Sequence, residues 1–142
     1  MKRPKIFETT PERSKLMSKI KSKNGPVERK LAKALWHHGV RYRLNYKKLP
    51  GSPDIAITKY RIAIFVDGEF WHGYNWEQKR TRIKNNRQYW IDKIETNMNR
   101  DKRNNDDLFL LDWYVIRFWA HDVDRRIDYC VDTILDAISM RQ

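Results

Sequence analysis

The sequence predicts an α/β fold in which helices flank a mixed β-sheet on both faces, with the element order ααβββαβα. Short alternating or continuous apolar runs predict the strands, and longer stretches with helical periodicity predict the helices between them. The chain has 142 residues, of which 40% are hydrophobic, which suits one domain with a real core. We therefore expect residues 1–142 to form a single domain.

Two helices are expected in the first third of the chain. Thr9-Thr10-Pro11-Glu12 is typical of a helix start, because it offers a hydroxyl cap, a proline in the first turn and an acid behind it. Asn24-Gly25-Pro26 ends that helix. Pro26 then opens a second helix, which Gly39 ends; its apolar stripe is Val27, Leu31, Ala34 and Leu35.

Three strands follow, and the first is indicated by alternation at Tyr42, Leu44 and Tyr46. Residues 54–58 and 61–66 predict two more strands around a two-residue turn, which places Ile55 opposite Ile64. The 61–66 run is apolar on both faces and is expected to be central. A polar, aromatic loop to about residue 82, a helix over roughly 84–106, a strand over 113–119 and a helix over 123–140 complete the prediction.

Basic residues are concentrated at the start of the chain, whose net charge is +12. Residues 1–50 hold 15 lysines and arginines against three acids, whereas residues 51–142 hold 15 of each sign. A basic segment on a neutral body favours a nucleic acid as partner, although a solubilising basic tail remains the alternative.

Composition also limits the class of protein. No apolar run approaches the ~20 residues of a membrane span, and the basic start has no apolar stretch typical of a signal peptide. Cys130 is the only cysteine, which excludes a disulfide framework and an all-cysteine metal site within one chain. We expect a cytoplasmic monomer with no membrane association.

Carboxylates gather where two predicted strands meet. The predicted register places Asp54, at the start of one strand, opposite Phe65 and therefore beside Val66, Asp67 and Glu69. Carboxylates and carbonyls are the ligands that Mg²⁺ prefers, so this edge is a candidate magnesium site. The alternative is an ordinary Asp67-Gly68 turn and a solvated strand end.

Two further features point to the same edge. One face of the long predicted helix carries Trp90, Ile94, Asn97 and Asp101. The face begins apolar and becomes polar at the Asn97 amide and the Asp101 carboxylate, and these two groups need partners if they are buried. A salt bridge with a neighbouring cation would satisfy them, and so would a polar cleft.

His72 follows the central strand, at the end of the sheet where clefts form in open α/β folds. Its imidazole could take a proton from water at neutral pH. The alternative is that His72 has only a structural role.

These features together resemble the very short patch repair endonuclease family over about residues 9–139. The resemblance rests on ordered motifs, which are Arg13-Ser14-Lys15-Leu16-Met17-Ser18-Lys19-Ile20, Pro26-Val27-Glu28-Arg29-Lys30-Leu31, Leu49-Pro50-Gly51-Ser52-Pro53-Asp54, Phe65-Val66-Asp67-Gly68-Glu69-Phe70-Trp71-His72-Gly73, Trp90, Lys93-Ile94, Asn97, Arg100-Asp101 and Trp113-Tyr114-Val115-Ile116-Arg117-Phe118-Trp119.

The resemblance implies a restriction-endonuclease-like fold and Mg²⁺-dependent cutting of one DNA strand. By that resemblance Asp54 and the backbone carbonyl of Val66 bind the metal, and His72 acts on the water or the phosphate. The matching positions that complete the site are Asp101, Asn97 and Glu28.

The resemblance also implies how DNA is held. The family's mismatch enzymes insert aromatic and methionine side chains beside a T·G pair, and Met17, Phe70 and Trp71 occupy those places. We expect residues 1–24 to contact DNA, with Lys19, Lys21 and Lys23 among the contacts, and residues 26–140 to form the catalytic core.

Two departures from the family pattern stand out. Known members hold a structural zinc with cysteines and histidine, whereas the matching positions here are Glu69, Tyr74, Trp76 and His121. These residues lack the thiolates of such a site, so no zinc is expected. Trp76 should instead anchor the loop by packing. Asp67 replaces a phosphate-contacting histidine and is therefore expected to join the Mg²⁺ site.

The leading hypothesis is a Mg²⁺-dependent endonuclease that nicks double-stranded DNA, with T·G mismatches as candidate targets. The alternatives are a restriction- or defence-associated nuclease of the same fold without mismatch preference, and an inactive DNA-binding module. RNA remains open as a substrate, and a partner protein from a repair or restriction system is compatible with either nuclease.

Overall fold

The computed structural model describes residues 25–69 and 72–142, so the helix expected after Thr9 lies outside it. The described elements are α2 (Pro26–His37), β1 (Arg43–Leu44), β2 (Ile55–Ile57), β3 (Ile62–Asp67), α3 (Trp76–Lys79), the 3-10 turn η1 (Arg80–Arg82), α4 (Arg87–Leu110), β4 (Tyr114–Trp119), α5 (Ala120–Arg125) and α6 (Ile127–Arg141). Within the described part of the chain, none of the helices is long and apolar enough to cross a membrane.

The four strands form a mixed sheet in the order β1-β2-β3-β4. The first three strands are antiparallel neighbours, and β4 runs parallel to β3. The central position expected for β3 is confirmed, and so is the register that pairs Ile55 with Ile64. The connection spans four residues, from Thr58 to Arg61, rather than the predicted two, because β2 ends one residue earlier and β3 begins one residue later than predicted. Arg61 in this connection takes a left-handed φ of 55°.

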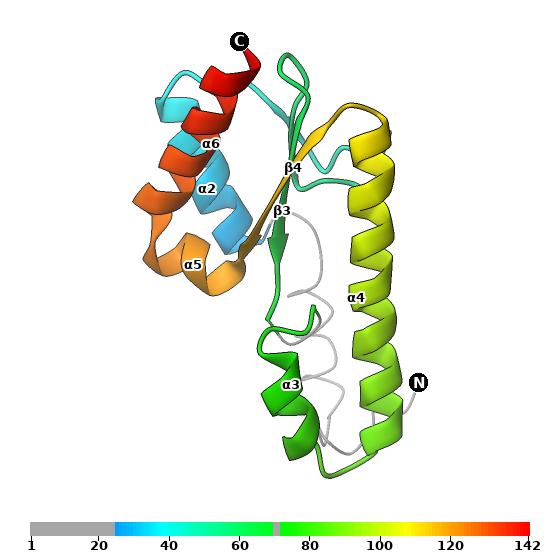
Figure 1. The fold of residues 1–142 in the computed structure, drawn as a ribbon. Helices are drawn as coiled ribbons and strands as arrows, with labels where there is room; N and C mark the ends of the chain where they lie inside the picture. Colours follow the sequence, from blue (N-terminus) through cyan, green and yellow to red (C-terminus); the bar gives the residue numbers. More distant parts are fainter. Residues whose placement is uncertain (1–24, 70–71) are drawn as a thin grey trace.

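Helices cover both faces of the sheet, as the sequence predicts (Figure 1). The alternation of β3 separates two packing faces: Ile62 and Ile64 pack in the core that includes α2, α5 and α6. Ala63 and Phe65 pack with Leu108 of α4 on the other face. Asp67 continues the second series, so the strand delivers its carboxylate to the α4 side.

The structure differs from the prediction in two helical regions. The closing helix is divided into α5 and α6 at Arg126, whose φ of −131° and ψ of 49° are not helical. Val123 before the break and Ile134 after it are both fully buried, so the break lets two helices pack on one core. The loop before α4 contains α3 and η1, which are too short to give a periodic signal.

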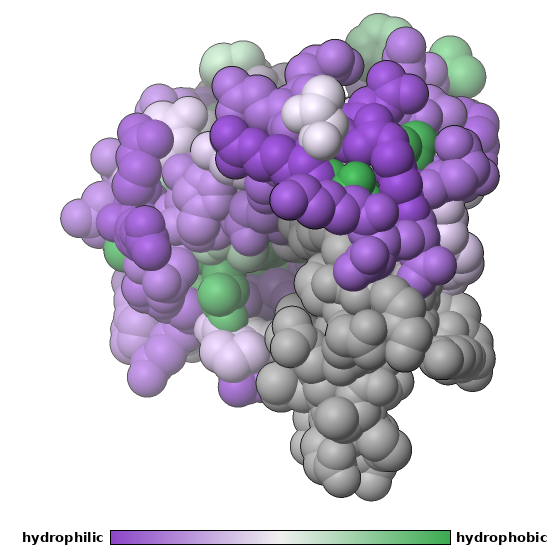
Figure 2. Space-filling view, turned by 90° about the horizontal axis from the view of Figure 1, so that it is seen from below, coloured by the Kyte–Doolittle hydropathy of each residue, from purple (hydrophilic) through white to green (hydrophobic). Residues whose placement is uncertain are grey.

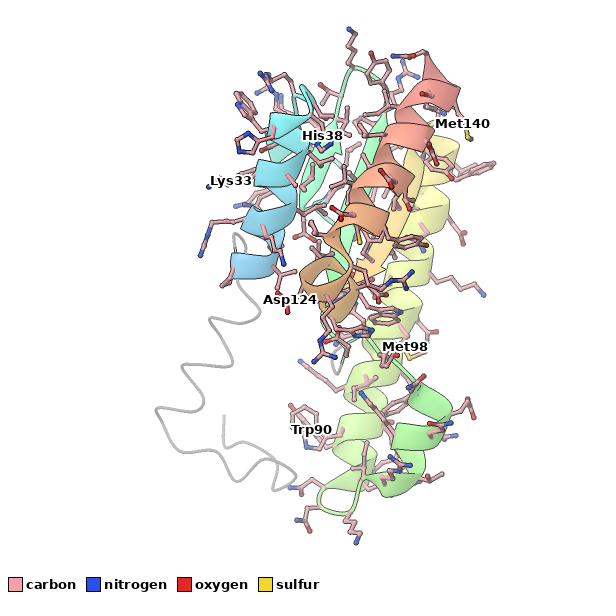
Figure 3. The ribbon with its side chains drawn as sticks, turned by 90° about the vertical axis from the view of Figure 1, so that its left-hand side faces the viewer. Lys33, His38, Trp90, Met98, Asp124 and Met140 are labelled. Atoms are coloured by element: carbon pink, nitrogen blue, oxygen red, sulfur yellow. The ribbon has the colours of Figure 1, made fainter. Side chains whose placement is uncertain are left out.

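The α3–α4 hairpin projects beyond the carboxyl end of β3 (Figure 1) and has a small core of its own. Its buried residues are Trp76, Ile83, Trp90, Ile91 and Ile94. Figure 3 labels Trp90 in this projecting part and Met98 further along α4. Seen from this end, the described surface is mostly hydrophilic (Figure 2), so the hairpin offers a polar surface next to the end of the sheet.

Candidate active site

Three side chains meet where β3 ends beside α4. Asp67 is the last residue of β3, His72 lies in the loop that follows, and Asp101 lies on α4. One possible ligand atom from each lies within 4.8 Å of the others. They line a cleft of about 270 Å³ together with Arg117, Met98 and Trp119. At ~30 Å³ per water, a volume of that size corresponds to roughly nine waters.

His72 and Asp101 form the closest pair in this group. The ring Nδ1 of His72 hydrogen-bonds Oδ2 of Asp101, and Oδ1 of Asp67 lies 3.8 Å from the same nitrogen. A carboxylate on one ring nitrogen fixes the tautomer and orientation of an imidazole and leaves the other nitrogen for a reactant. Asp101, at the end of the predicted helix stripe, therefore lines a cleft with charged and polar side chains.

Gly73 keeps His72 close to α4. Its φ is 77°, which favours glycine, and a Cβ at this position would collide with the side chain of Met98. The backbone N–H of His72 also donates to the carbonyl of Gly68 at 3.1 Å, which closes the loop after β3. A larger residue at position 73 would be strained in this backbone conformation and would require the Met98 side chain or the loop to shift.

Asp67 is buried, with 6% of its surface exposed. Burial raises the pKa of its carboxyl group, and the positive charge of Arg117 opposes that rise. Nη1 of Arg117 donates to both carboxylate oxygens at 3.1 Å each. The acid that departs from the family pattern is therefore paired with a cation from β4.

Arg117 and Asn105 are functional candidates that the sequence analysis missed. Nε of Arg117 donates to Oδ1 of Asn105 at 2.7 Å, and Nη2 donates to the backbone carbonyl of Asp101 at 3.4 Å. The sequence does contain a signal for Arg117, because a single arginine inside an otherwise apolar strand needs partners when it is buried. Asn105 also lies one helical turn beyond Asp101 on the same side of α4.

Asp54 lies at a separate point of the same sheet edge. It directly precedes β2, and its Oδ2 accepts the backbone N–H of Val66 at 2.8 Å. Its carboxylate therefore reaches the backbone of Val66, which is the pairing that the predicted register requires. The candidate ligand group nearby is Asp67, His72 and Asp101, and its donors are mostly carboxylate oxygens, so the residues present fit Mg²⁺ better than a softer metal.

The remaining predicted site residues either lie on helices outside the cleft or fall outside the described part of the chain. Asn97 is half-buried on α4, one turn before Asp101, and Glu28 lies in the first turn of α2. Neither lines the cleft beside Asp67. Six predicted DNA-contacting residues lie outside the described part of the chain; these are Met17, Lys19, Lys21, Lys23, Phe70 and Trp71.

The positions that match zinc ligands in the family form a network of protein contacts. Oε2 of Glu69 accepts the backbone N–H of His121 at 2.8 Å and lies 2.8 Å from the ring Nδ1 of the same residue. The ring of Tyr74 packs edge-on against His121, with centroids 4.7 Å apart. Trp76 is buried and donates to Glu95 at 2.8 Å, so its expected role as a packing anchor is confirmed.

Comparison with known proteins decides the family. The family model described as DNA mismatch endonuclease Vsr matches residues 6–78. The chain belongs to the Vsr family. Membership confirms the resemblance, the restriction-endonuclease-like fold class and the prediction of an endodeoxyribonuclease.

Individual Vsr-family relatives align over most of this chain. The type II nicking enzyme V.NmeDIP of Neisseria meningitidis serogroup C is 46% identical over 94% of this chain and 90% of its own length. The type II nicking enzyme V.HpaIIP of Haemophilus parainfluenzae is 50% identical over 80% of this chain and 82% of its own. DNA mismatch endonuclease Vsr of Escherichia coli (strain K12) is 36% identical over 75% of this chain and 68% of its own.

Proposed function

We propose that this Vsr-family protein is a Mg²⁺-dependent endonuclease that nicks one strand of double-stranded DNA in the cytoplasm. The observation that carries the proposal is the His72–Asp101 pair in a cleft at the carboxyl end of β3, beside the Asp54–Val66 contact. Relatives that align over most of the chain are named nicking enzymes, which supports a single-strand cut. A catalytically inactive module would have no need of this acid–histidine pair.

The proposed roles follow from the contacts. His72, held by Asp101 through Nδ1, takes the proton from the attacking water through its other ring nitrogen. Asp54 and the backbone carbonyl of Val66 hold Mg²⁺, with Asp67 close by on the same edge of the sheet. When bound, the ion neutralises charge that develops on the phosphate and lowers the pKa of a bound water. Asn97 and Glu28 complete the site in this proposal.

We propose a preference for T·G pairs as the substrate specificity. The family description names a mismatch endonuclease. By the sequence resemblance, Met17, Phe70 and Trp71 occupy the places of the family's wedge side chains. Unstacking a base step costs a few kcal/mol and costs least at a mismatched pair, so a wedge would favour such DNA. The basic residues 1–24 would hold the duplex, and a monomer suffices for a single nick.

Two substrates in one experiment test this proposal. Supercoiled plasmid incubated with the protein and Mg²⁺ should become nicked circles, while the Asp101→Asn variant, matched in size, should leave it intact. Duplexes that differ only in a T·G or a T·A pair then measure the preference. Nicking of the two duplexes at equal rates would favour a restriction- or defence-associated nuclease. If neither the plasmid nor either duplex is cut, only a DNA-binding module remains.

A further inference from the structure

Two carboxylates lie near one nitrogen of His72. Nδ1 hydrogen-bonds Oδ2 of Asp101, yet Oδ1 of Asp67 lies only 3.8 Å away. A small rotation of the imidazole would exchange one partner for the other. Because Asp67 lies on β3 and Asp101 on α4, the choice of partner sets the direction of the second ring nitrogen.

Arg117 occupies one of these two acids. Its Nη1 donates to both oxygens of Asp67 at 3.1 Å, whereas Oδ1 of Asp101 lies 3.9 Å from the same atom. Nη2 reaches only the backbone carbonyl of Asp101, at 3.4 Å. The guanidinium therefore binds one carboxylate directly and leaves the other to the histidine.

The guanidinium is itself held in place. Its Nε donates to Asn105 at 2.7 Å, and its central carbon lies 4.0 Å from the centre of the Phe65 ring. A planar group fixed by an amide and an aromatic face has little freedom to follow Asp67 toward His72. Only 17% of the Arg117 side chain is exposed, so solvent screens its pairing with Asp67 weakly.

We propose that Arg117 is a positioning residue that binds Asp67 and so directs His72 to Asp101. The role rests on the proposed function, in which His72 acts on the attacking water. Without the guanidinium, Asp67 would be a second acceptor for Nδ1 and a second negative charge beside Asp101. The imidazole would then divide between two orientations, of which one serves the reaction.

The substitution Arg117→Gln tests the role in the intact, Mg²⁺-free protein by nitrogen NMR of the histidine rings. The chain has four histidines, so four ring systems need assignment. We expect the ring signals of His72 to shift or broaden in Arg117→Gln and to stay unchanged in Arg61→Gln. Arg61 is a matched control because it pairs with Asp112 at 3.2 Å on an exposed surface away from the cleft.

Nicking kinetics provide the second measurement. Arg117→Gln should lower kcat about tenfold or more, up to the ~10²–10⁴-fold that acid–base groups supply, and should change KM little. Adding Asp67→Asn to this variant removes the competing carboxylate and should restore the wild-type ring signals of His72 in the Mg²⁺-free protein, which a purely structural arginine would not allow. Arg117→Lys keeps the charge without the planar fork, so its kcat should lie between that of Arg117→Gln and that of the wild type.

Unchanged His72 signals in Arg117→Gln would overturn the inference, and so would a double variant whose His72 signals stay as shifted as those of the single variant. If Arg117→Gln does not fold, Arg117→Lys and the double variant carry the same comparison. A wild-type protein that cuts no DNA would refute the proposed function alone, because the ring signals would still decide whether Arg117 directs His72.

Discussion

The ring of His72 and the carboxylate of Asp101, 29 residues apart, form a direct hydrogen bond at the end of the sheet. One residue lies in a loop whose path is fixed by Gly73 against Met98, and the other lies on the helix that carries Met98. The pair therefore depends on how the loop docks on α4. Its location beside Asp67 and Asp54 makes this edge of the sheet the place to test for catalysis.

His72→Ala should lower kcat about 10²–10⁴-fold, the range that general acid–base groups supply. Asp101→Asn should lower kcat as well, because an amide holds the imidazole without stabilising its protonated form. Single-turnover nicking of a plasmid measures both variants. Met140→Ala, at an exposed position on α6, serves as the control and should cut at the wild-type rate. A loss below about threefold for His72→Ala would make His72 a structural residue.

Asp54→Asn should abolish cleavage while DNA binding survives or improves. Phosphodiester hydrolysis in this proposal needs a metal-activated water, and the metal needs this carboxylate. The amide keeps an oxygen that can accept the Val66 N–H, so the thermal midpoint should change little. Cleavage and binding are measured on one duplex with and without Mg²⁺, and near-wild-type cutting would refute the metal role of Asp54.

Purified protein should contain no stoichiometric zinc, and a chelator should stop cleavage without unfolding the chain. The positions that match the family's zinc ligands are joined instead by the contact of Glu69 with His121 and the packing of Tyr74. Elemental analysis checks the first statement, and circular dichroism with added chelator checks the second. One zinc ion per chain, or unfolding by the chelator, would show a metal that this network does not explain.

The Glu69–His121 pair should make stability depend on acid pH. Burial alone would raise the pKa of Glu69, but the hydrogen bonds from His121 outweigh it and hold that pKa below its ordinary value. A carboxyl group with a lowered pKa in the folded state stabilises the fold above its unfolded pKa, and this contribution is lost as the pH falls through the folded value.

The measurement is the thermal midpoint from neutral pH down to roughly pH 3, below the ordinary pKa of a glutamate. Glu69→Gln should lower the midpoint at neutral pH and make it fall less steeply in acid than the wild-type midpoint does. Glu77→Gln, at an exposed position on α3, is the control. Parallel curves for Glu69→Gln and wild type would mean that the pair adds nothing to stability.

DNA binding should weaken steeply with salt, and charge reversal at Lys19, Lys21 and Lys23 should flatten that dependence. Each phosphate neutralised by a cation contributes about 0.9 to the log–log slope on duplex DNA. The matched control reverses three exposed cations of the body, which are Lys33, Lys59 and Arg125. Equal slopes for the two triple variants would make the basic first third a solubilising surface.

Much of the fold follows from local patterns in the sequence. Alternation over 54–66 places Ile55 opposite Ile64, and continuous apolarity makes β3 an interior strand. The four-residue α3 and the break at Arg126 carry no periodic signal, since the first is too short and the second interrupts a continuous apolar face. Their positions depend on what Trp76 and Val123 pack against.

The sequence by itself determined the family, through ordered motifs, and the candidate acids and histidine of the site. Only the tertiary structure decided how these groups are paired. Asp101 turns to His72, Asp67 turns to Arg117 50 residues away, and Asn105 fixes that arginine. The physical reason is that periodicity reports which face a side chain occupies, whereas a hydrogen bond between distant elements depends on strand register and helix docking.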